Sequence, residues 1–395
     1  MIKKIHIEKI SKEKEDKILN TPLISKQEAT KAFIHCIEQI EASINVCNDK
    51  FLSPNTYNNK YKLIPNIEWT NGFFTGMIFL CYEYTKDEKF LNIALQHIDS
   101  FYDRIKNKIE VNHHDLGFLY SPSCVSAVKI LNSKKAKDCV ILAANQLISR
   151  YREKGEFIQA WGTLDAKEHY RFIIDCMLNL PLLYFASNIT NDDTYKIIAK
   201  KHLNTSIKYC IREDASTFHT FYMDPLTGLP LKGVTRQGFN DNSSWARGQA
   251  WGIYGIPLNI ENLSKEDAIP LFKGLTNYFI NRQPNDFVSI WDLIFTENDN
   301  QPKDSSSSAI AVCGMLSMKQ FLEKNDQIFY EKCSSLILRS LINNYTTNIE
   351  PLSPILKHGV YSYHSNKGVN EGNVWGDYFY MEALSKIITG FNSYF

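Results

Sequence analysis

The sequence predicts an all-α protein folded as a closed double ring of helical hairpins, an (α/α)6 toroid. Apolar residues recur at helical spacing along most of the 395 residues, and period-two alternation is scarce. The helical segments also arrive in about six consecutive pairs. An open superhelix of the same pairs is the alternative, but the pairs lack the fixed sequence period of solenoid repeats. The closed ring is therefore favoured.

The helices can be placed in order along the chain. Ala29, Phe33 and Ile37 recur at steps of three and four, which places the first helix at Lys26–Val46. The same spacing predicts helices at Gly72–Tyr84, Lys89–Ile105, Pro122–Leu131, Ala136–Tyr151, Ile174–Ser187, Tyr195–Ile211, Ser244–Leu258, Lys265–Asn281, Ser306–Leu322, Ile328–Tyr345 and Gly376–Ile388. The loops before the inner helices of such a ring converge at one end, where we expect the chemistry.

Two prolines refine these boundaries. Ser121 and Pro122 are a plausible N-cap and N1 pair, so a helix is expected to open there. Pro181 lies inside an apolar helical run and should kink or open the helix near residue 180.

The chain is expected to form one domain over residues 1–395, with residues 1–25 as an N-terminal extension, because no Pro-rich or Ser-rich linker divides it. Its 44 basic and 43 acidic residues give a net charge of +1, which argues against nucleic-acid binding by phosphate neutralisation. No run of 18 apolar residues occurs, so no membrane association is expected. The charge neither favours nor forbids self-association, and we expect a monomer.

The N-terminus and the cysteines favour a cytoplasmic location. Lys3, Lys4 and Glu8 interrupt the apolar stretch that a signal peptide needs. The 9 cysteines are odd in number, widely spread and free of C-x-x-C spacing. Reduced, mostly buried thiols are therefore expected.

Four inter-helix segments are rich in Trp, His, Asp, Gln and Arg, although plain connectors are expected there. In the first, Glu68–Gly76, Trp69 offers a flat apolar face of the type that stacks on sugar rings. Gly72 and Gly76 permit close approach of a helix or a ligand. A buried Trp beside two packing glycines is the structural alternative.

The second segment is Asn112–Phe118. Its adjacent His113 and His114 could suggest a metal, but neighbouring side chains do not converge as ligands four residues apart do. We therefore expect no metal site. Asp115 stands before the apolar Leu116 and is interpreted as a carboxylate with an altered pKa or as a turn aspartate.

The third segment is His169–Asn179, where Asp175 interrupts an apolar run. A charge there is costly unless it is paired, protonated or facing a cleft. The alternative is an aspartate at a helix N-terminus that is bonded to backbone amides.

The fourth segment is Gln237–Tyr254. Arg247 and Trp251 are four residues apart, so a guanidinium and an indole share one helical face. This pair is suited to holding a carboxylate beside a sugar plane. A structural salt bridge from Arg247 to Asp241 is the alternative.

Taken together, these segments resemble the unsaturated glucuronyl hydrolases, family 88 of the glycoside hydrolases. The matching pieces occur in the family's order and span residues 69 to 384. They are Trp69–Phe73, His113–Phe118, Ile174–Asn179, Trp245–Trp251, Asp304–Ser306 and Gly376–Leu384. The sequence departs from the family pattern at Phe74, where a second Trp is expected, and in the lengthened Ser305–Ser308 run. These departures concern ring stacking and local packing rather than the carboxylates.

The resemblance implies the (α/α)6 fold and a hydrolase that acts on small unsaturated oligosaccharides left by polysaccharide lyases. Such enzymes hydrate the C4=C5 vinyl ether of the terminal uronic acid, and no metal or organic cofactor is required. By the family pattern, Asp175 is both acid and base, and Asp115 raises the pKa of Asp175. The remaining residues matched by the resemblance contact the sugar or its carboxylate: Trp69 as the stacking wall, and His219, Gln237, Arg247 and Trp251.

Substrate choice is predicted from the segment Tyr361–Gly368. Ser362, Ser365 and Lys367 resemble the S-x-x-S-x-K found in family members that act on sulfated glycosaminoglycan disaccharides. Two hydroxyl groups and an ammonium are a reasonable sulfate site. A polar surface loop is the alternative. The expected substrates are unsaturated chondroitin or hyaluronan disaccharides, including sulfated ones.

Other functions remain open from the sequence alone. An unsaturated rhamnogalacturonyl hydrolase has the same toroid and reaction but accepts pectin fragments. A polysaccharide lyase would create the alkene rather than remove it. A non-catalytic sugar-binding protein would bind without turnover, but it has no need of two carboxylates in one set of loops.

Overall fold

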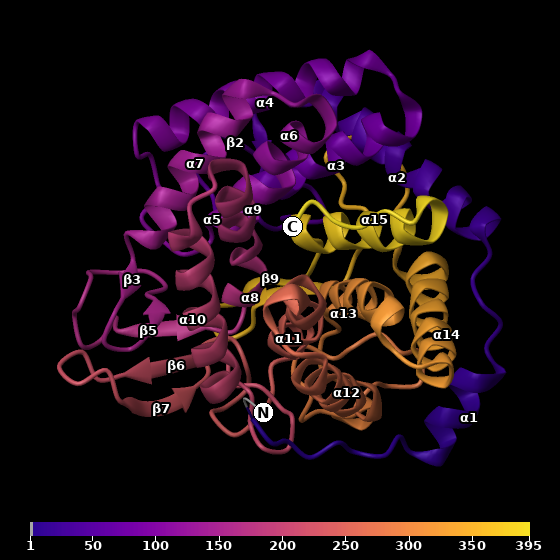
Figure 1. Ribbon diagram of the computed structural model, residues 1–395. Helices are drawn as coiled ribbons and strands as arrows, with labels where there is room; N and C mark the ends of the chain where they lie inside the picture. The colour runs from indigo at the N-terminus through magenta and orange to yellow at the C-terminus, as the bar shows by residue number, and fades with distance from the viewer. Residues whose placement is uncertain (1–2) are drawn as a thin grey trace.

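The computed structural model describes residues 3–395 and has two concentric rings of helices (Figure 1). The inner ring consists of α3 (Asn71–Thr85), α5 (Leu116–Tyr120) with η1 (Ser121–Val125) and α6 (Ser126–Leu131), α8 (Cys176–Asn179) with α9 (Pro181–Thr190), α11 (Ala246–Leu258), α13 (Ser305–Met318) and α15 (Val374–Thr389). Neighbouring inner elements pack together, and α15 packs against α3, which closes the ring. The predicted toroid is confirmed.

The outer ring alternates with the inner one along the chain. It consists of α2 (Lys26–Cys47), α4 (Glu88–Lys106), α7 (Lys134–Ile148), α10 (Asp193–Cys210), α12 (Lys265–Asn281) and α14 (Lys324–Ser340). Outer helices are amphipathic: on α4, Phe90, Ala94 and Phe101 are buried and Glu88 is exposed. Inner helices such as α13 are buried over almost their whole length because both faces contact protein.

The two proline predictions have different outcomes. Pro181 opens α9 directly after α8, as expected. The expectation that Ser121 caps a helix is wrong, because helical backbone already begins at Leu116. Ser121 and Pro122 lie in the π-helical turn η1. Pro122 has no backbone N–H, so the regular α-helical hydrogen-bond pattern is interrupted there.

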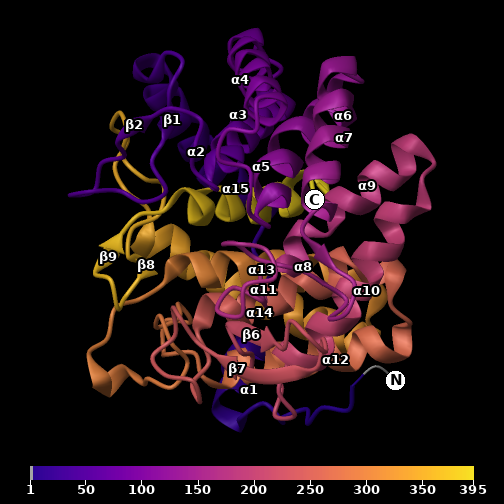
Figure 2. The same cartoon turned by 90° about the vertical axis from the view of Figure 1, so that its left-hand side faces the viewer.

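Short antiparallel strands, which the sequence analysis did not predict, connect the helices at the end of the ring that carries the site loops (Figure 2). They are β1 (Phe51–Leu52) with β2 (Leu63–Ile64), β3 (Tyr151–Arg152) with β4 (Phe157–Ile158), β5 (Arg171–Ile173) with β6 (Thr220–Met223) and β7 (Pro230–Val234), and β8 (Gly359–Ser362) with β9 (Lys367–Glu371). Most are too short to display alternation. The N-terminal extension contains a further helix, α1 (Lys12–Asn20), which packs against α14.

Buried arginines hold the connecting loops in place. Arg104, 2% exposed, donates to Ile67 O at 3.0 Å, Glu68 O at 3.0 Å and Glu110 O at 2.8 Å. It thereby joins the loop before α3 to the loop before α5. Arg150 donates to Gln159 O at 2.8 Å, so the loop after β4 is held in the same way.

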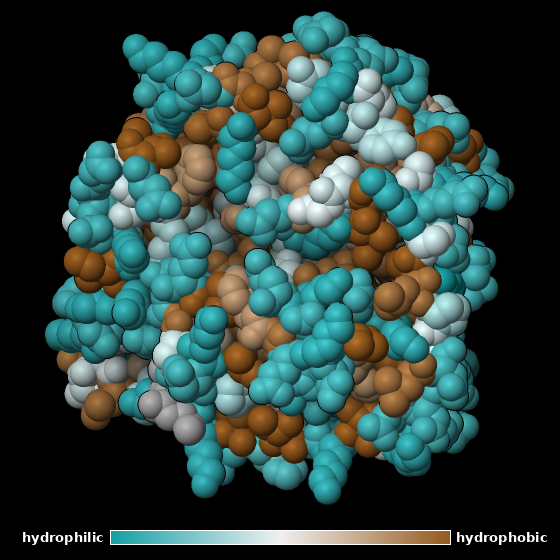
Figure 3. Space-filling model, turned by 45° about the vertical axis from the view of Figure 1, so that its right-hand side comes forward, coloured by the Kyte–Doolittle hydropathy of each residue, from teal (hydrophilic) through white to brown (hydrophobic). Residues whose placement is uncertain are grey.

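Hydrophilic and hydrophobic groups are interspersed over the face drawn in Figure 3. Among residues 3–395, no helix combines the length and apolar character needed to cross a membrane.

Close packing of the inner helices depends on glycine. A Cβ built at Gly72 of α3 would lie 2.2 Å from Phe118 O and 2.3 Å from Leu119 O, both backbone atoms. At Gly252 of α11, the nearest atoms are Leu275 methyl carbons at 3.3 and 3.5 Å.

We expect Gly72→Ala to destabilise the protein by about 3 kcal/mol or to prevent folding, because backbone cannot move away from the added methyl group. Gly252→Ala is the matched control and should stay within about 1 kcal/mol of the wild type, since helix propensity offsets mild crowding. Urea unfolding followed by circular dichroism measures both. Equal stability of the two variants would contradict the packing described for Gly72.

Candidate active site

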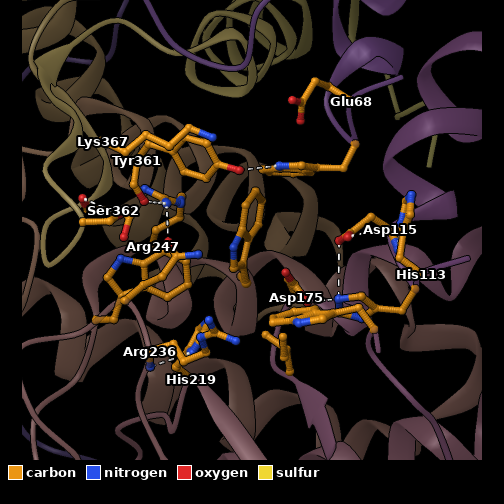
Figure 4. Close-up of a pocket in the computed structure, with 18 of the residues that line it drawn as sticks. Glu68, His113, Asp115, Asp175, His219, Arg236, Arg247, Tyr361, Ser362 and Lys367 are labelled. Atoms are coloured by element: carbon orange, nitrogen blue, oxygen red, sulfur yellow. Dashed lines mark hydrogen bonds and ion pairs between the residues drawn. The ribbon is translucent and has the colours of Figure 1, made fainter. Parts of the chain in front are cut away.

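A cavity of about 650 Å³ is lined by residues from the inter-helix loops, the short strands and the starts of inner helices. Figure 4 shows Asp115 and His113 on one side of it and Ser362 and Lys367 on the opposite side. All of the predicted site residues line this cavity: Trp69, Asp115, Asp175, His219, Gln237, Arg247, Trp251, Ser362, Ser365 and Lys367.

The two aspartates reach the cavity because each directly precedes a short inner helix. Asp175 follows β5 and precedes α8, and Asp115 precedes α5. Neither side chain makes a capping hydrogen bond to its helix, although the backbone N–H groups of Asp175 and Cys176 favour the ionised form of Asp175. Asp175 Oδ1 is buried without a hydrogen-bond partner.

The aspartates differ in their electrostatics. Burial and the neighbouring Asp115 raise the pKa of Asp175 well above its usual range. Burial opposes ionisation of Asp115 and is the largest single influence on it, but His114, His113 and Arg150 together outweigh burial and hold the pKa of Asp115 below its usual range. The pair therefore favours one protonated and one ionised carboxyl group near neutral pH.

Three side chains meet at this point. His114 Nε2 lies 3.5 Å from Asp115 Oδ1 and 3.7 Å from Asp175 Oδ1. One possible ligand atom from each of the three residues lies within 4.8 Å of the others. The sequence-based expectation that the reaction needs no metal stays a prediction.

Several aromatic rings line the cavity. Trp69 donates from Nε1 to Tyr361 Oη at 2.9 Å and stacks on Trp375 with ring centroids 5.4 Å apart. It is half-buried, so part of its face remains available. Trp251 is almost fully buried and packs on Phe118, 5.3 Å between centroids. The sequence analysis missed Trp161, which lies in an irregular loop without a motif.

Arg247 organises the site rather than offering a free cation. Its Nη1 donates to Asp304 Oδ2 at 2.8 Å and to Val360 O. Its Nη2 donates to Gln237 Oε1 and to Tyr361 O, each at 2.8 Å. The alternative that Arg247 pairs with Asp241 is wrong, because Asp304 takes that place.

Both departures from the family pattern lie outside the cavity. Phe74 is fully buried with its ring centroid 5.7 Å from that of His97, so the expected second Trp would be a core residue. In the Ser305–Ser308 run, Ser306 accepts from Trp375 Nε1 at 3.0 Å and donates to Asp304. Local packing is affected, and the carboxylates are not.

His219 and Arg236 lie side by side on the cavity wall (Figure 4). His219 Nδ1 accepts the Arg236 backbone N–H at 3.1 Å, and burial lowers the pKa of His219 to about 3. The Arg236 guanidinium lies 5.5 Å from the Trp161 ring centroid, and no ion pair involves it among residues 3–395. Sequence reasoning missed Arg236, although it directly precedes Gln237.

The predicted sulfate residues lie on one hairpin. Ser362 and Lys367 are cross-strand partners on β8 and β9, and Ser365 lies in the turn. The Lys367 ammonium is 4.2 Å from the Tyr361 ring centroid. Lys367 and Arg236 thus bring cationic groups to the side of the cavity away from Asp115.

An (α/α)6 ring whose cavity combines a carboxyl pair, aromatic walls and cationic groups defines a sugar-acting hydrolase. The family model described as Glycosyl Hydrolase Family 88 matches residues 43–344. The chain belongs to glycosyl hydrolase family 88.

Named relatives agree with this assignment. The unsaturated chondroitin disaccharide hydrolase of Streptococcus pneumoniae (strain ATCC BAA-255 / R6) is 50% identical, with 100% of each chain covered. The crystal structure of unsaturated glucuronyl hydrolase from Streptococcus agalactiae matches with a TM-score of 0.97 at 49% identity, covering 100% of both chains. Its D175N variant complexed with dGlcA-GalNAc6S matches with a TM-score of 0.90 at 45% identity, again covering 100% of both chains.

The Arg247–Asp304 pair should be essential for stability because both side chains are almost fully buried. We expect Asp304→Asn to destabilise the protein by about 3 kcal/mol, since it leaves a buried guanidinium without its counter-charge. Denaturant unfolding measures this loss. In Arg247→Met combined with Asp304→Asn, the loss should be smaller than the sum of the single losses, and strict additivity would contradict the pairing.

Proposed function

We propose that this protein releases 4,5-unsaturated uronic acid from the non-reducing end of glycosaminoglycan disaccharides produced by lyases. The main support is that two neighbouring carboxyl groups line one cavity, with the pKa of Asp175 raised and the pKa of Asp115 lowered. An acid that keeps its proton near neutral pH is what protonation of an enol-ether carbon requires.

The hydration can be written with these two residues. Asp175 transfers its proton to C4, and the positive charge that forms at C5 is shared with the ring oxygen. Water adds to C5 and returns a proton to the Asp175 carboxylate, so the acid is regenerated. The resulting hemiketal opens and releases the second sugar. Asp115 remains ionised and accepts hydrogen bonds from ring hydroxyls.

Several features support a sulfated chondroitin substrate. Lys367, Ser362 and Ser365 place an ammonium and two hydroxyl groups on one hairpin that lines the cavity. The Streptococcus relatives are named for chondroitin disaccharides, and one was crystallised with dGlcA-GalNAc6S. Trp69 is proposed as the stacking wall and His219 as a polar contact to the sugar.

In this proposal, Arg247 acts indirectly on the substrate. Its terminal nitrogens hold Gln237 and the hairpin carbonyls, so it positions the groups that contact the sugar. The residue type that the resemblance implies is therefore present, but the contact with the uronate is proposed for Gln237 and Arg236.

We further propose one domain that acts as a monomer in the cytoplasm. The proposed cytoplasmic location is supported by the cysteines, all nine of which are free and buried. Burial raises the pKa of Cys47 to about 12 and that of Cys36 well above its usual range, so these two thiols are poor nucleophiles.

Asp175→Asn should lower the rate of alkene loss by at least about a hundredfold, because the amide cannot supply the acidic proton. The assay follows the absorbance of an unsaturated chondroitin disaccharide near 232 nm. The control is Asp99→Asn, which changes an exposed aspartate that does not line the cavity. This variant should retain the wild-type rate. Turnover of pectin-derived disaccharides alone would favour a rhamnogalacturonyl hydrolase, and binding without turnover would favour a sugar-binding protein.

Lys367→Ala should reduce kcat/KM for a sulfated disaccharide by about tenfold more than for its unsulfated counterpart, since only the sulfate loses its cation. The ratio of the two kcat/KM values is the measured quantity. Lys357→Ala, outside the cavity lining, serves as the control. If this ratio is the same in Lys367→Ala as in the wild type, Lys367 does not contribute to sulfate recognition.

A further inference from the structure

The imidazole of His114 lies between the two carboxyl groups of the site. Its Nε2 is within 4 Å of Oδ1 of both Asp115 and Asp175. The side chain is buried, and the His114 backbone N–H donates to Ala160 O at 2.8 Å, which fixes the residue in its loop. The ring is therefore held at the point where the two carboxyl groups approach each other.

Solvent does not reach the atoms that face each other here. Both ring nitrogens of His114 and Oδ1 of Asp175 are buried and have no hydrogen-bond partner within residues 3–395. Unpaired buried polar atoms are costly, and the two carboxyl oxygens lie 3.5 and 3.7 Å from Nε2. His114 Nε2 is therefore placed to donate a hydrogen bond to these carboxyl oxygens when the contacts shorten around a bound substrate.

The adjacent His113 cannot take this role in its neutral form. Its Nδ1 accepts the Asp115 backbone N–H at 3.0 Å, and its Nε2 lies 3.1 Å from Glu110 O. A carbonyl oxygen only accepts, so the ring proton of His113 is on Nε2. Although His113 Nδ1 is 3.3 Å from Asp115 Oδ2, it has no proton to donate there.

We propose that His114 is a positioning residue that carries its ring proton on Nε2 and directs it at Asp115 Oδ1 and Asp175 Oδ1. This donor stabilises Asp115 as the anion and occupies the inner oxygen of Asp175. The acidic proton of Asp175 is then left on Oδ2, the oxygen that can meet C4 of the substrate. The proposal rests on the hydration reaction proposed above.

The electrostatic surroundings agree with a neutral ring. Burial lowers the pKa of His114 to about 4, so the imidazole carries one proton near neutral pH. Nearby cations oppose a second proton. Besides Asp115 and Asp175, the titratable or charged groups that face this cluster are His113, Arg150, Arg171, Cys176, His202, His219 and Arg247.

The position of the proton can be measured without turnover. Long-range ¹⁵N–¹H correlation spectra of histidine-labelled protein should assign His114 as the Nε2–H tautomer, with His114→Gln used to identify its signals. A signal pattern for Nδ1–H would overturn the proposal. This result is independent of the substrate, so it stands even if the unsaturated disaccharide is not turned over.

Kinetics then separate positioning from a merely structural role. His114→Leu removes the donor, so Asp115 should ionise at higher pH and the acid limb of kcat/KM should move up by about one pH unit. We also expect kcat to fall at least about tenfold. His114→Gln keeps an N–H near the position of Nε2 and should return the acid limb toward its wild-type position.

The matched control is His97→Leu, which replaces a buried histidine bonded to Thr75 and remote from the cavity lining. It should lower stability without moving the acid limb. An unmoved limb in a folded His114→Leu protein would overturn the proposal, and failure of the wild type to remove the alkene would overturn the proposed function instead.

Discussion

The site depends on buried guanidinium groups that bind the carbonyl oxygens of the connecting loops. Arg104, Arg150 and Arg247 are each almost fully buried, and each joins segments that carry cavity residues or flank them, whereas the buried Arg171 binds Glu168 O within its own loop. A ring of short inner helices leaves many loop carbonyls away from water, and these must be satisfied internally. Arginine suits this task because one planar group offers five donors in fixed directions, whereas lysine offers a single point charge.

Within that frame, the reaction centre combines two groups that repel each other when both are ionised. Asp115 and Asp175 come from loops far apart in sequence, and only the closed ring brings them together. Their proximity is unfavourable for folding when both are charged, yet it produces the unequal proton affinities that the hydration needs. Both carboxyl groups are buried, which limits screening by water and preserves the difference.

The helices were predictable because their apolar faces repeat over many residues, as on Lys26–Val46. The strands were not, since two-residue pairs such as β1 and β2 contain too little pattern. Asp175 was singled out because it interrupts an apolar run, and its pairing with Asp115 was implied by the resemblance to the family. The partner of Arg247 was missed: Asp304 is 57 residues away, and only tertiary packing selects it over the nearby Asp241. Arg236 and Trp161 lie in irregular loops, where periodicity carries no information.

The hairpin of β8 and β9 has a consequence for how such enzymes diversify. Its base is fixed by main-chain oxygens of Val360 and Tyr361, which any side chains at those positions would present equally well to Arg247. The turn that is proposed to contact the second sugar is therefore mechanically separate from the proposed acid Asp175. Evolution can exchange this turn, and with it the preference for a leaving sugar, while the chemistry at the other side of the pocket is inherited intact.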